Sequence, residues 1–207
     1  MRLFSLSTQA LMVVLVGIWL STSVLGGAAS QWDSQILSAL RPDELGYLIE
    51  TARYVNWLGD WLVLIPVGIV GVAFLFWQGK QGEALSLALI LISVRLLVVV
   101  QKNFLGRTRP DVEQWMLETS FAFPSGHAAN SAATYVGLAL LLTKSRAAIC
   151  AATGISAAIG TSRVVLGVHW PSDVIGGWAF GALSAVVLWQ LQTRRGDDFT
   201  HRSRSGR

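Results

Sequence analysis

The sequence predicts an all-α protein, a transmembrane bundle of six helices, and three observations lead to this fold class. Of the 207 residues, 53% are hydrophobic and only 14% are charged, and the mean hydropathy is +0.53. Such a balance is far too apolar for an ordinary soluble domain of this length. The apolar residues gather in six stretches, most of them close to the roughly 20 residues that a helix needs to cross a bilayer core. Tryptophans near the ends of these stretches fit an interfacial aromatic belt.

The six expected spans are, in chain order, Leu6 to Ala29, Trp61 to Trp77, Ala84 to Val100, Ala128 to Thr143, Ala147 to Val168 and Val174 to Leu191. The first starts behind a basic residue and ends in small residues, so it also resembles a cleavable signal peptide. It is long for the apolar core of such a signal, and its loss would leave five spans with the two termini on opposite sides. A retained span is favoured, with cleavage as the alternative.

The other spans carry their own local signals. The second begins and ends at tryptophans, and the fourth is short, so we expect it to continue back through the stretch Pro124 to His127. The fifth contains Cys150, the only cysteine, so neither a disulfide framework nor a cysteine zinc cluster can be built. In the sixth, Gly177 and Gly181 have the GxxxG spacing that is typical of helix packing.

The chain shows no long repeat and no second domain, so residues 1–207 are expected to form one integral-membrane domain. It ends in a polar, arginine-rich tail at about residues 193–207. We interpret this tail as a solvated cytoplasmic segment that touches anionic membrane lipid, rather than as a nucleic-acid arm. His201 within the tail is expected to be solvated and idle. We infer no nucleic-acid partner and no obligate protein partner.

The distribution of basic residues predicts the orientation in the membrane. Nine of the 16 lysines and arginines fall on one side, which is therefore expected to be cytoplasmic: Arg2, Lys80, Lys144, Arg146, Arg194, Arg195, Arg202, Arg204 and Arg207. The first loop on the other side is acidic. This places a multi-pass protein in the cell (inner) membrane, with its second face turned to the periplasm or the extracytoplasmic space.

Polar residues cluster in three islands that interrupt the apolar background. They run from Lys102 to Pro110, from Pro124 to His127, and from Ser162 to Asp173. With alternating helices, the end of the third span, the start of the fourth, the end of the fifth and the start of the sixth all lie on the outer face. The three islands can therefore meet there.

From the islands we select three cations, two imidazoles, a carboxylate and a hydroxyl: Lys102, Arg109, Arg163, His127, His169, Asp173 and Ser125. Ionisable groups at membrane depth are costly and usually mark a functional site. Three converging cations need an anion between them. Each feature alone has a plainer explanation as a helix cap, an interfacial anchor or a snorkelling side chain, but independent anchors need not share one face.

The second and third islands suggest how an anion would be handled. Ser125 is a candidate helix N-cap, Gly126 lets an anion approach the backbone, and His127 in the first turn can donate a proton. In the third island, His169 precedes Asp173 by four residues, so the carboxylate can hold one ring nitrogen and aim the other. Pro171 fits the first turn of the sixth helix.

Two further possibilities concern the surroundings of this site. Arg95 lies seven residues before Lys102 and faces the same way, so it is either a support for the site or a snorkelling side chain. Two histidines and an aspartate are also a possible zinc set. Three nearby cations would repel a metal ion, so no metal site and no cofactor are expected.

These residues carry a family resemblance. K-x6-RP from Lys102 to Pro110, PSGH from Pro124 to His127 and SR-x5-H-x3-D from Ser162 to Asp173 resemble the three-part signature of the type 2 phosphatidic acid phosphatase superfamily. The six-span layout resembles its membrane branch, which handles lipid phosphates and polyprenyl diphosphates. Soluble vanadium haloperoxidases and acid phosphatases resemble the chain in the motifs only.

The resemblance implies a role for each residue of the signature. His169 would be the nucleophile that forms a phosphohistidine, oriented by Asp173, and His127 would be the general acid for the leaving alkoxide. The phosphate would be held by Lys102, Arg109, Ser125, the Gly126 backbone and Arg163. Fixed cations and N–H donors suit the charge that phosphoryl transfer places on the non-bridging oxygens.

We therefore predict a metal-independent membrane lipid phosphatase or diphosphatase whose site faces outward. The favoured substrates are undecaprenyl diphosphate, phosphatidylglycerophosphate and phosphatidic acid. The alternative is a non-catalytic lipid or anion carrier with the same cationic site, although a carrier has no need for an aspartate-held histidine facing a second histidine. A haloperoxidase would require vanadate and usually a larger soluble fold.

Overall fold

The computed structural model describes residues 2–41, 46–143 and 145–205, with side chains for 7–41, 46–143 and 145–192. In these residues the chain is all-helical, without a strand. The elements are α1 (Arg2–Leu25), α2 (Gln31–Leu40), α3 (Gly46–Trp57), α4 (Trp61–Trp77), α5 (Gln81–Leu105), α6 (Gly126–Ser131), the π-helix η1 (Ala132–Val136), α7 (Gly137–Leu142), α8 (Arg146–Val165) and α9 (Pro171–Ser205). Lys144 and the side chains of the predicted tail lie outside the described residues.

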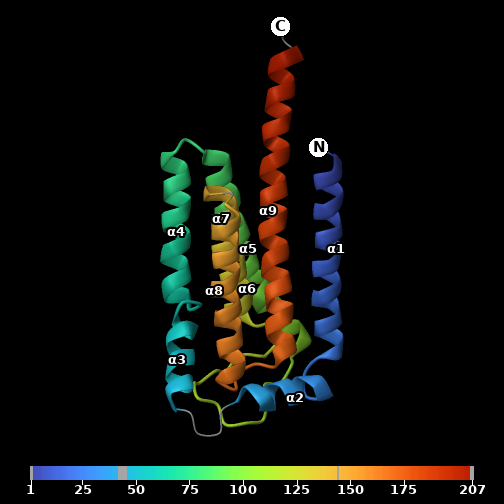
Figure 1. Cartoon of the computed structure of the whole chain (residues 1–207), viewed down its shortest axis with the longest axis vertical. Helices are drawn as coiled ribbons and strands as arrows, with labels where there is room; N and C mark the ends of the chain where they lie inside the picture. Colours follow the sequence, from blue (N-terminus) through green and yellow to red (C-terminus); the bar gives the residue numbers. More distant parts are fainter. Residues whose placement is uncertain (1, 42–45, 144, 206–207) are drawn as a thin grey trace.

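The long helices run side by side as a bundle, with both ends of the chain at the same end of it (Figure 1). Five segments of the described chain are long and apolar enough to cross a membrane: Ser7–Leu25, Gly46–Trp77, Gln81–Leu105, Arg146–Val165 and Pro171–Gln192. They confirm the predicted all-α membrane fold. The fourth predicted span is not among them, because residues 126–142 form a shorter segment that the π-helix η1 interrupts.

Helix ends follow local sequence signals. α4 has the predicted bounds, and the Asp60 side chain caps it by accepting the Leu62 N–H at 2.9 Å. α5 continues past the predicted end to Leu105, where Gly106 adopts a left-handed φ of 57° that favours glycine. α8 stops before the predicted Val168, because Gly167 at φ 73° turns the chain. α9 continues through much of the predicted tail.

Two helices between α1 and α4 have no counterpart in the sequence prediction. α2 lies across the end of the bundle that is opposite to the chain termini, and α3 continues the line of α4 at that same end (Figure 1). The Ser30 hydroxyl caps α2 by accepting the Asp33 N–H at 3.4 Å. Both helices are short and of mixed polarity, so a search for long apolar runs overlooks them.

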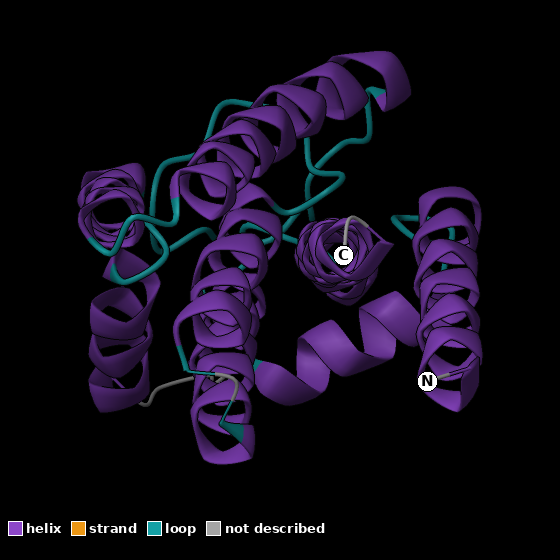
Figure 2. Cartoon of the chain, turned by 90° about the horizontal axis from the view of Figure 1, so that it is seen from above, coloured by secondary structure: helices purple, strands orange, loops and turns teal. Residues whose placement is uncertain are grey.

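Small residues let α9 approach α6 closely. A Cβ added to Gly177 would lie 2.7 Å from the Ser125 carbonyl oxygen, and one added to Gly181 would meet the Ala129 carbonyl. The GxxxG pair therefore serves helix packing, as predicted. Seen from above, α9 stands between α1 and the rest of the bundle (Figure 2). This packing sets the start of α6 beside the start of α9, where two of the polar islands lie.

Candidate active site

A polar cavity of about 400 Å³ is lined by residues at or near the ends of α5 and α8 and the starts of α6 and α9. These helix ends lie at the same end of the bundle (Figure 1). Its lining includes six residues that the sequence analysis selected: Lys102, Arg109, Gly126, His127, Arg163 and His169. The two others, Ser125 and Asp173, are fully buried. The prediction that the three islands meet at one end of the bundle is thus confirmed.

The histidine and aspartate of the third island form a pair. His169 lies in the turn between α8 and α9, and its Nδ1 is 3.3 Å from Asp173 Oδ2. The same carboxylate oxygen accepts the Trp170 N–H at 2.9 Å. The other ring nitrogen, Nε2, lies 3.3 Å from Nη1 of Arg109. Asp173 therefore turns Nε2 of His169 toward the cations of the cavity.

Burial controls the ionisation of His169. The side chain is 1% exposed, and burial lowers its pKa well below the usual value of 6.5, with Arg109, Arg163 and Lys102 adding to the shift. Both effects disfavour the imidazolium ion. At neutral pH the ring is therefore uncharged, and Nε2 can carry the lone pair of a nucleophile.

The second island begins α6 where the sequence analysis expected a helix start. Ser125 occupies the N-cap position, but its hydroxyl makes no capping bond. Instead its backbone N–H donates to the Asp173 carbonyl oxygen at 2.9 Å, which ties the start of α6 to the start of α9. Ser125 Oγ and His127 Nε2 are buried without a hydrogen-bond partner among the described residues. Both atoms are free to bind a ligand.

Two cations of the first island are held by the loop between α5 and α6. Lys102 Nζ donates to Ser120 Oγ at 3.3 Å and also to the Phe121 carbonyl oxygen. Arg109 donates from Nε to the Ser120 carbonyl oxygen at 2.8 Å and from Nη1 to the Val168 carbonyl oxygen. These loop contacts hold the two positive charges at the cavity wall.

Arg163 is fully buried and makes the most polar contacts from α8. Its Nη1 donates to Asn56 Oδ1 at 2.5 Å and approaches Met116 Sδ at 2.9 Å. Its Nη2 pairs with the carboxylate of Glu118, whose other oxygen lies 3.5 Å from Nη2 of Arg109. Glu118 therefore bridges two predicted phosphate-binding arginines. An anion was predicted between these cations, but Glu118 itself was not, because a single acidic residue in a loop has no characteristic spacing to other residues.

Arg107 and Asp33 are two further polar residues that the sequence analysis did not select. Arg107 lies in the first island, and its Nη1 is 2.8 Å from Asp173 Oδ1. Asp33, from α2, accepts hydrogen bonds from the backbone N–H and the hydroxyl of Ser172, at 2.8 and 2.6 Å. Arg107 could have been selected from the sequence, because it lies within the first island. Asp33 could not, because its contact with Ser172 of α9 joins positions 139 residues apart.

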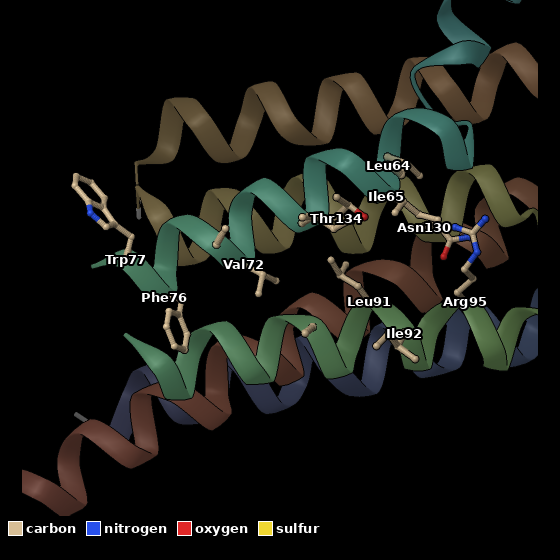
Figure 3. A pocket seen from close by; sticks show the side chains of 14 residues that line it. Leu64, Ile65, Val72, Phe76, Trp77, Leu91, Ile92, Arg95, Asn130 and Thr134 are labelled. Carbon is tan, nitrogen blue, oxygen red and sulfur yellow. The ribbon is translucent and has the colours of Figure 1, made fainter. Parts of the chain in front are cut away.

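An apolar pocket of about 680 Å³ adjoins the polar cavity. It lies mainly between α4 and α5, and it shares Leu64, Arg95 and Asn130 with the cavity lining. Figure 3 shows Arg95 and Asn130 together at one end of this pocket, with Phe76 and Trp77 toward the other. Arg95 is thus placed at the junction of a polar space and an apolar one.

Comparison with known proteins identifies the family. Residues 83–197, more than half of the chain, match the PAP2 superfamily, and this range contains all three islands. The chain belongs to the PAP2 superfamily. Phosphatidylglycerophosphatase B of Bacillus subtilis (strain 168) is 32% identical over 172 residues, which cover 79% of this chain and 85% of the relative. Lipid A 1-phosphatase of Rhizobium etli is 31% identical, covering 67% and 70%.

Solved structures agree with this assignment to the PAP2 superfamily. The crystal structure of a transmembrane PAP2 type phosphatidylglycerolphosphate phosphatase from Bacillus subtilis superposes with a TM-score of 0.81 at 30% identity, covering 88% of this chain and 96% of that one. The predicted family and the predicted enzyme class, a phosphoric monoester hydrolase or diphosphatase, are confirmed. The roles of the individual residues stay predictions.

Proposed function

We propose that this PAP2 protein is a metal-independent membrane lipid phosphatase that works through a phosphohistidine at His169. The observation that carries the proposal is the junction of two spaces. The polar cavity offers fixed cations and the His169–Asp173 pair, and the apolar pocket beside it offers space for a hydrocarbon chain. A lipid phosphate has both chemistries in one molecule.

The apolar pocket fits a chain that enters from the bilayer. It is lined almost entirely by aliphatic and aromatic side chains of α4 and α5, which lie along the bundle (Figures 1 and 3). Leu64, Arg95 and Asn130 belong to both spaces, so a headgroup in the cavity and a chain in the pocket are continuous there. Arg95 at this junction is well placed to steer the headgroup.

The first chemical step is proposed to be attack by His169. Nε2 bonds to phosphorus as the bond from phosphorus to the leaving oxygen breaks, and His127 gives a proton to that oxygen. The negative charge on the non-bridging oxygens is stabilised by the cations of the cavity wall, Lys102, Arg109 and Arg163, and by the hydroxyl of Ser125 and the backbone of Gly126. Asp173 accepts the Nδ1–H bond throughout and stabilises the charged ring.

The second step regenerates the enzyme. Water attacks the phosphorus of the phosphohistidine, the bond to Nε2 breaks, and inorganic phosphate leaves. The neutral His127 left by the first step takes a proton from this water, which restores the acid for the next cycle. Because protein cations carry the charge stabilisation, no divalent ion is needed in either step.

Phosphatidylglycerophosphate is the first substrate to test, followed by undecaprenyl diphosphate and phosphatidic acid. The Bacillus subtilis relative that matches most of both chains is named phosphatidylglycerophosphatase B. A relative from Sulfolobus acidocaldarius, 28% identical over 156 residues that cover 72% of this chain and 70% of the relative, is named undecaprenyl-diphosphatase. The pocket between α4 and α5 suits the hydrocarbon part of each of these lipids.

A membrane topology belongs to the proposal. Residues 126–142 would complete a sixth crossing, both termini would be cytoplasmic, and the cavity would face outward. In support, the termini share one end of the bundle and the cavity lies at the other (Figure 1). Gln78→Cys, in the α4–α5 connection, and Asp111→Cys, in the α5–α6 loop, give exposed probes in a Cys150→Ala background. An impermeant thiol reagent should label only Asp111→Cys from outside, and labelling of both from one side would overturn the topology.

The activity test is phosphate release from the three lipids by the purified protein in detergent with EDTA. Glycerol 3-phosphate is the matched control, because it keeps the phosphate ester and lacks the chains. We expect release from at least one lipid, much slower release from the control, and inhibition by orthovanadate. Binding of lipid without release would favour a carrier, and activity restored only by a divalent ion would contradict the metal-independent mechanism.

A further inference from the structure

Arg107 stands two positions before Arg109 but points away from the cavity. Its side chain is 10% exposed, it does not line the cavity, and its guanidinium stacks over the Phe123 ring, 4.4 Å from the centroid. In the described part of the chain, the hydrogen bonds of the guanidinium run to the end of α1 and to the start of α9. Arg107 therefore contacts the His169–Asp173 pair from the side that faces away from the cavity.

The contact with α1 fixes the direction of the guanidinium. Nη2 donates to the carbonyl oxygens of Thr22 and Ser23, both at 2.8 Å. These residues belong to the last turn of α1, whose carbonyls lack partners within the helix. The end of a helix also attracts a positive charge. With Nη2 held in this way, the planar fork leaves Nη1 aimed at α9.

The contact with α9 is equally determined. Nη1 donates to Asp173 Oδ1 at 2.8 Å and to Ser172 Oγ at 3.1 Å. Ser172 has a single O–H, which donates to Asp33 Oδ2 at 2.6 Å, so its oxygen is left to accept from Arg107. Asp33 is itself held by the Gly27 N–H at 2.6 Å. Each donor in this network thus has a specific acceptor.

We propose that Arg107 is a positioning residue for the His169–Asp173 pair. It occupies Oδ1 of Asp173, which leaves Oδ2 for His169 Nδ1, and it supplies the positive charge that a fully buried carboxylate needs. The inference rests on the proposed function, because it assigns a purpose to a pair whose catalytic role is itself proposed. Arg107 touches neither the cavity nor the substrate.

The proposal predicts a change in pH dependence. The charged and titratable groups around the pair are Arg107, Asp33, Arg109, Arg163, Lys102 and His127, with Glu118 beyond the arginines. Removing only Arg107 leaves the buried carboxylate to draw a proton onto its partner, so the pKa of His169 rises. The acidic limb of kcat/KM then moves upward by about one pH unit.

The experiment compares Arg107→Met, Arg107→Lys and the control Arg41→Met with the wild type on an aryl phosphate. Arg41 is a fair control, because it also anchors the α5–α6 loop, through the Glu113 carbonyl oxygen at 3.0 Å, and does not contact Asp173. For Arg107→Met we expect kcat to fall about 10- to 100-fold with KM nearly unchanged and with the upward shift of the limb. Arg107→Lys should keep the limb in place while kcat falls about fivefold.

The outcomes separate the two proposals. A wild type that releases no phosphate overturns the proposed function. An active wild type with an unmoved limb in Arg107→Met overturns the positioning role. Acid unfolding of a destabilised variant would also move the limb, so each sample is returned to about pH 7.5 and assayed again to separate it from titration. If Arg107→Met does not fold, wild-type kcat in Arg107→Lys overturns it as well. Arg41→Met should match the wild type in kcat and in the position of the limb, and a shifted limb there would also contradict the proposal.

Discussion

Arg107 and Arg109 flank the His169–Asp173 pair from opposite sides, and their surroundings differ in kind. Arg107 belongs to a rear network that also includes Asp33, Ser172 and Asp173, and its donors end on backbone carbonyls of a helix end and on a buried carboxylate. Arg109 belongs to the cavity wall, where its Nη2 meets Ser120 Oγ at 3.1 Å and Glu118 at 3.5 Å.

The contacts of the rear network are permanent, whereas some contacts of the cavity wall can be exchanged for contacts with a ligand. In the rear network the acceptors lie in α1, α2 and α9, and none of them lines the cavity. The cavity wall also uses backbone carbonyls, but there Nη2 of Arg109 meets a loop hydroxyl and the carboxylate of Glu118, which is 23% exposed. A phosphate can take over these bonds. We therefore propose that the rear network aims His169 and that the cavity wall receives the substrate.

The largest expected effect comes from removing the nucleophile between the two regions. His169→Gln should lower kcat by about 10⁴-fold or more for lipid and aryl phosphates alike, because no first step remains. The measurement is single turnover with radiolabelled substrate, in which the wild type should give an acid-labile phosphoenzyme and the variant none. A phosphoenzyme in His169→Gln would move the nucleophile to another residue.

His127→Ala tests the cavity side and should discriminate between substrates. An alkyl lipid phosphate needs a proton on its leaving oxygen, so its kcat should fall about 10²- to 10⁴-fold. An aryl phosphate releases a phenolate of low pKa and should lose much less in the first step. Slow hydrolysis should also let phosphohistidine accumulate. Equal losses on both substrates without a trapped phosphoenzyme would remove the proposed division of labour between the two histidines.

Arg163→Lys keeps a charge in the cavity wall but loses the guanidinium fork. We expect a loss of about 2 kcal/mol of transition-state stabilisation, roughly thirtyfold in kcat/KM. An ammonium group lacks the planar fork with which a guanidinium can contact two phosphate oxygens side by side while another of its N–H groups donates to Asn56. Arg53→Lys is the control, because Arg53 pairs with Glu50 on the surface and does not line the cavity. Near wild-type turnover in Arg163→Lys would reduce Arg163 to a structural anchor.

The sequence predicted the cavity wall far better than the rear network. Apolar runs of bilayer length gave the long helices, and alternation of these helices brought Lys102, Arg163 and His169 to one end. Contacts of Arg107 with Thr22 and of Asp33 with Ser172 join positions 85 and 139 residues apart. No local periodicity encodes such pairs, because they arise only when α1, α2 and the α5–α6 loop pack around the start of α9.

Two fold features also escaped the sequence analysis for physical reasons. The short helices α2 and α3 are of mixed polarity, so neither length nor continuous apolarity marks them. The π-helix η1, which interrupts residues 126–142, packs against α8 and α9 and contains no proline that would mark it in the sequence. Both features lie where the bundle shapes the cavity or its approach.

Glu118→Gln should reveal how exchangeable the cavity wall is. The carboxylate competes with phosphate for Arg109 and Arg163, and removing its charge should strengthen inhibition by orthovanadate or inorganic phosphate about fivefold, near 1 kcal/mol for a partly exposed pair. Glu113→Gln is the matched control, since Glu113 is an exposed acid of the same loop. Unchanged or weaker inhibition in Glu118→Gln would mean that the carboxylate is a permanent part of the wall.

The smallest expected effect is in the pH profile of the wild type. Burial and Arg109 hold the pKa of His169 well below 6.5, so the uncharged nucleophile persists as the pH falls and is lost only when the pH passes through that lowered pKa. An ordinary imidazole would lose about fourfold in its neutral fraction between about pH 7.5 and pH 6. We expect kcat/KM for an aryl phosphate of low second pKa to change less than about 1.5-fold over this range.

An aryl phosphate isolates this effect, because its leaving group does not need the proton of His127 and its own ionisation is complete over the range. Returning each sample to about pH 7.5 before a second assay separates titration from acid unfolding. An acidic limb of wild-type kcat/KM near pH 6.5 would mean that Arg109 does not lower the pKa of His169 in the working enzyme. The cavity wall would then leave the nucleophile unperturbed, and the rear network alone would set its protonation.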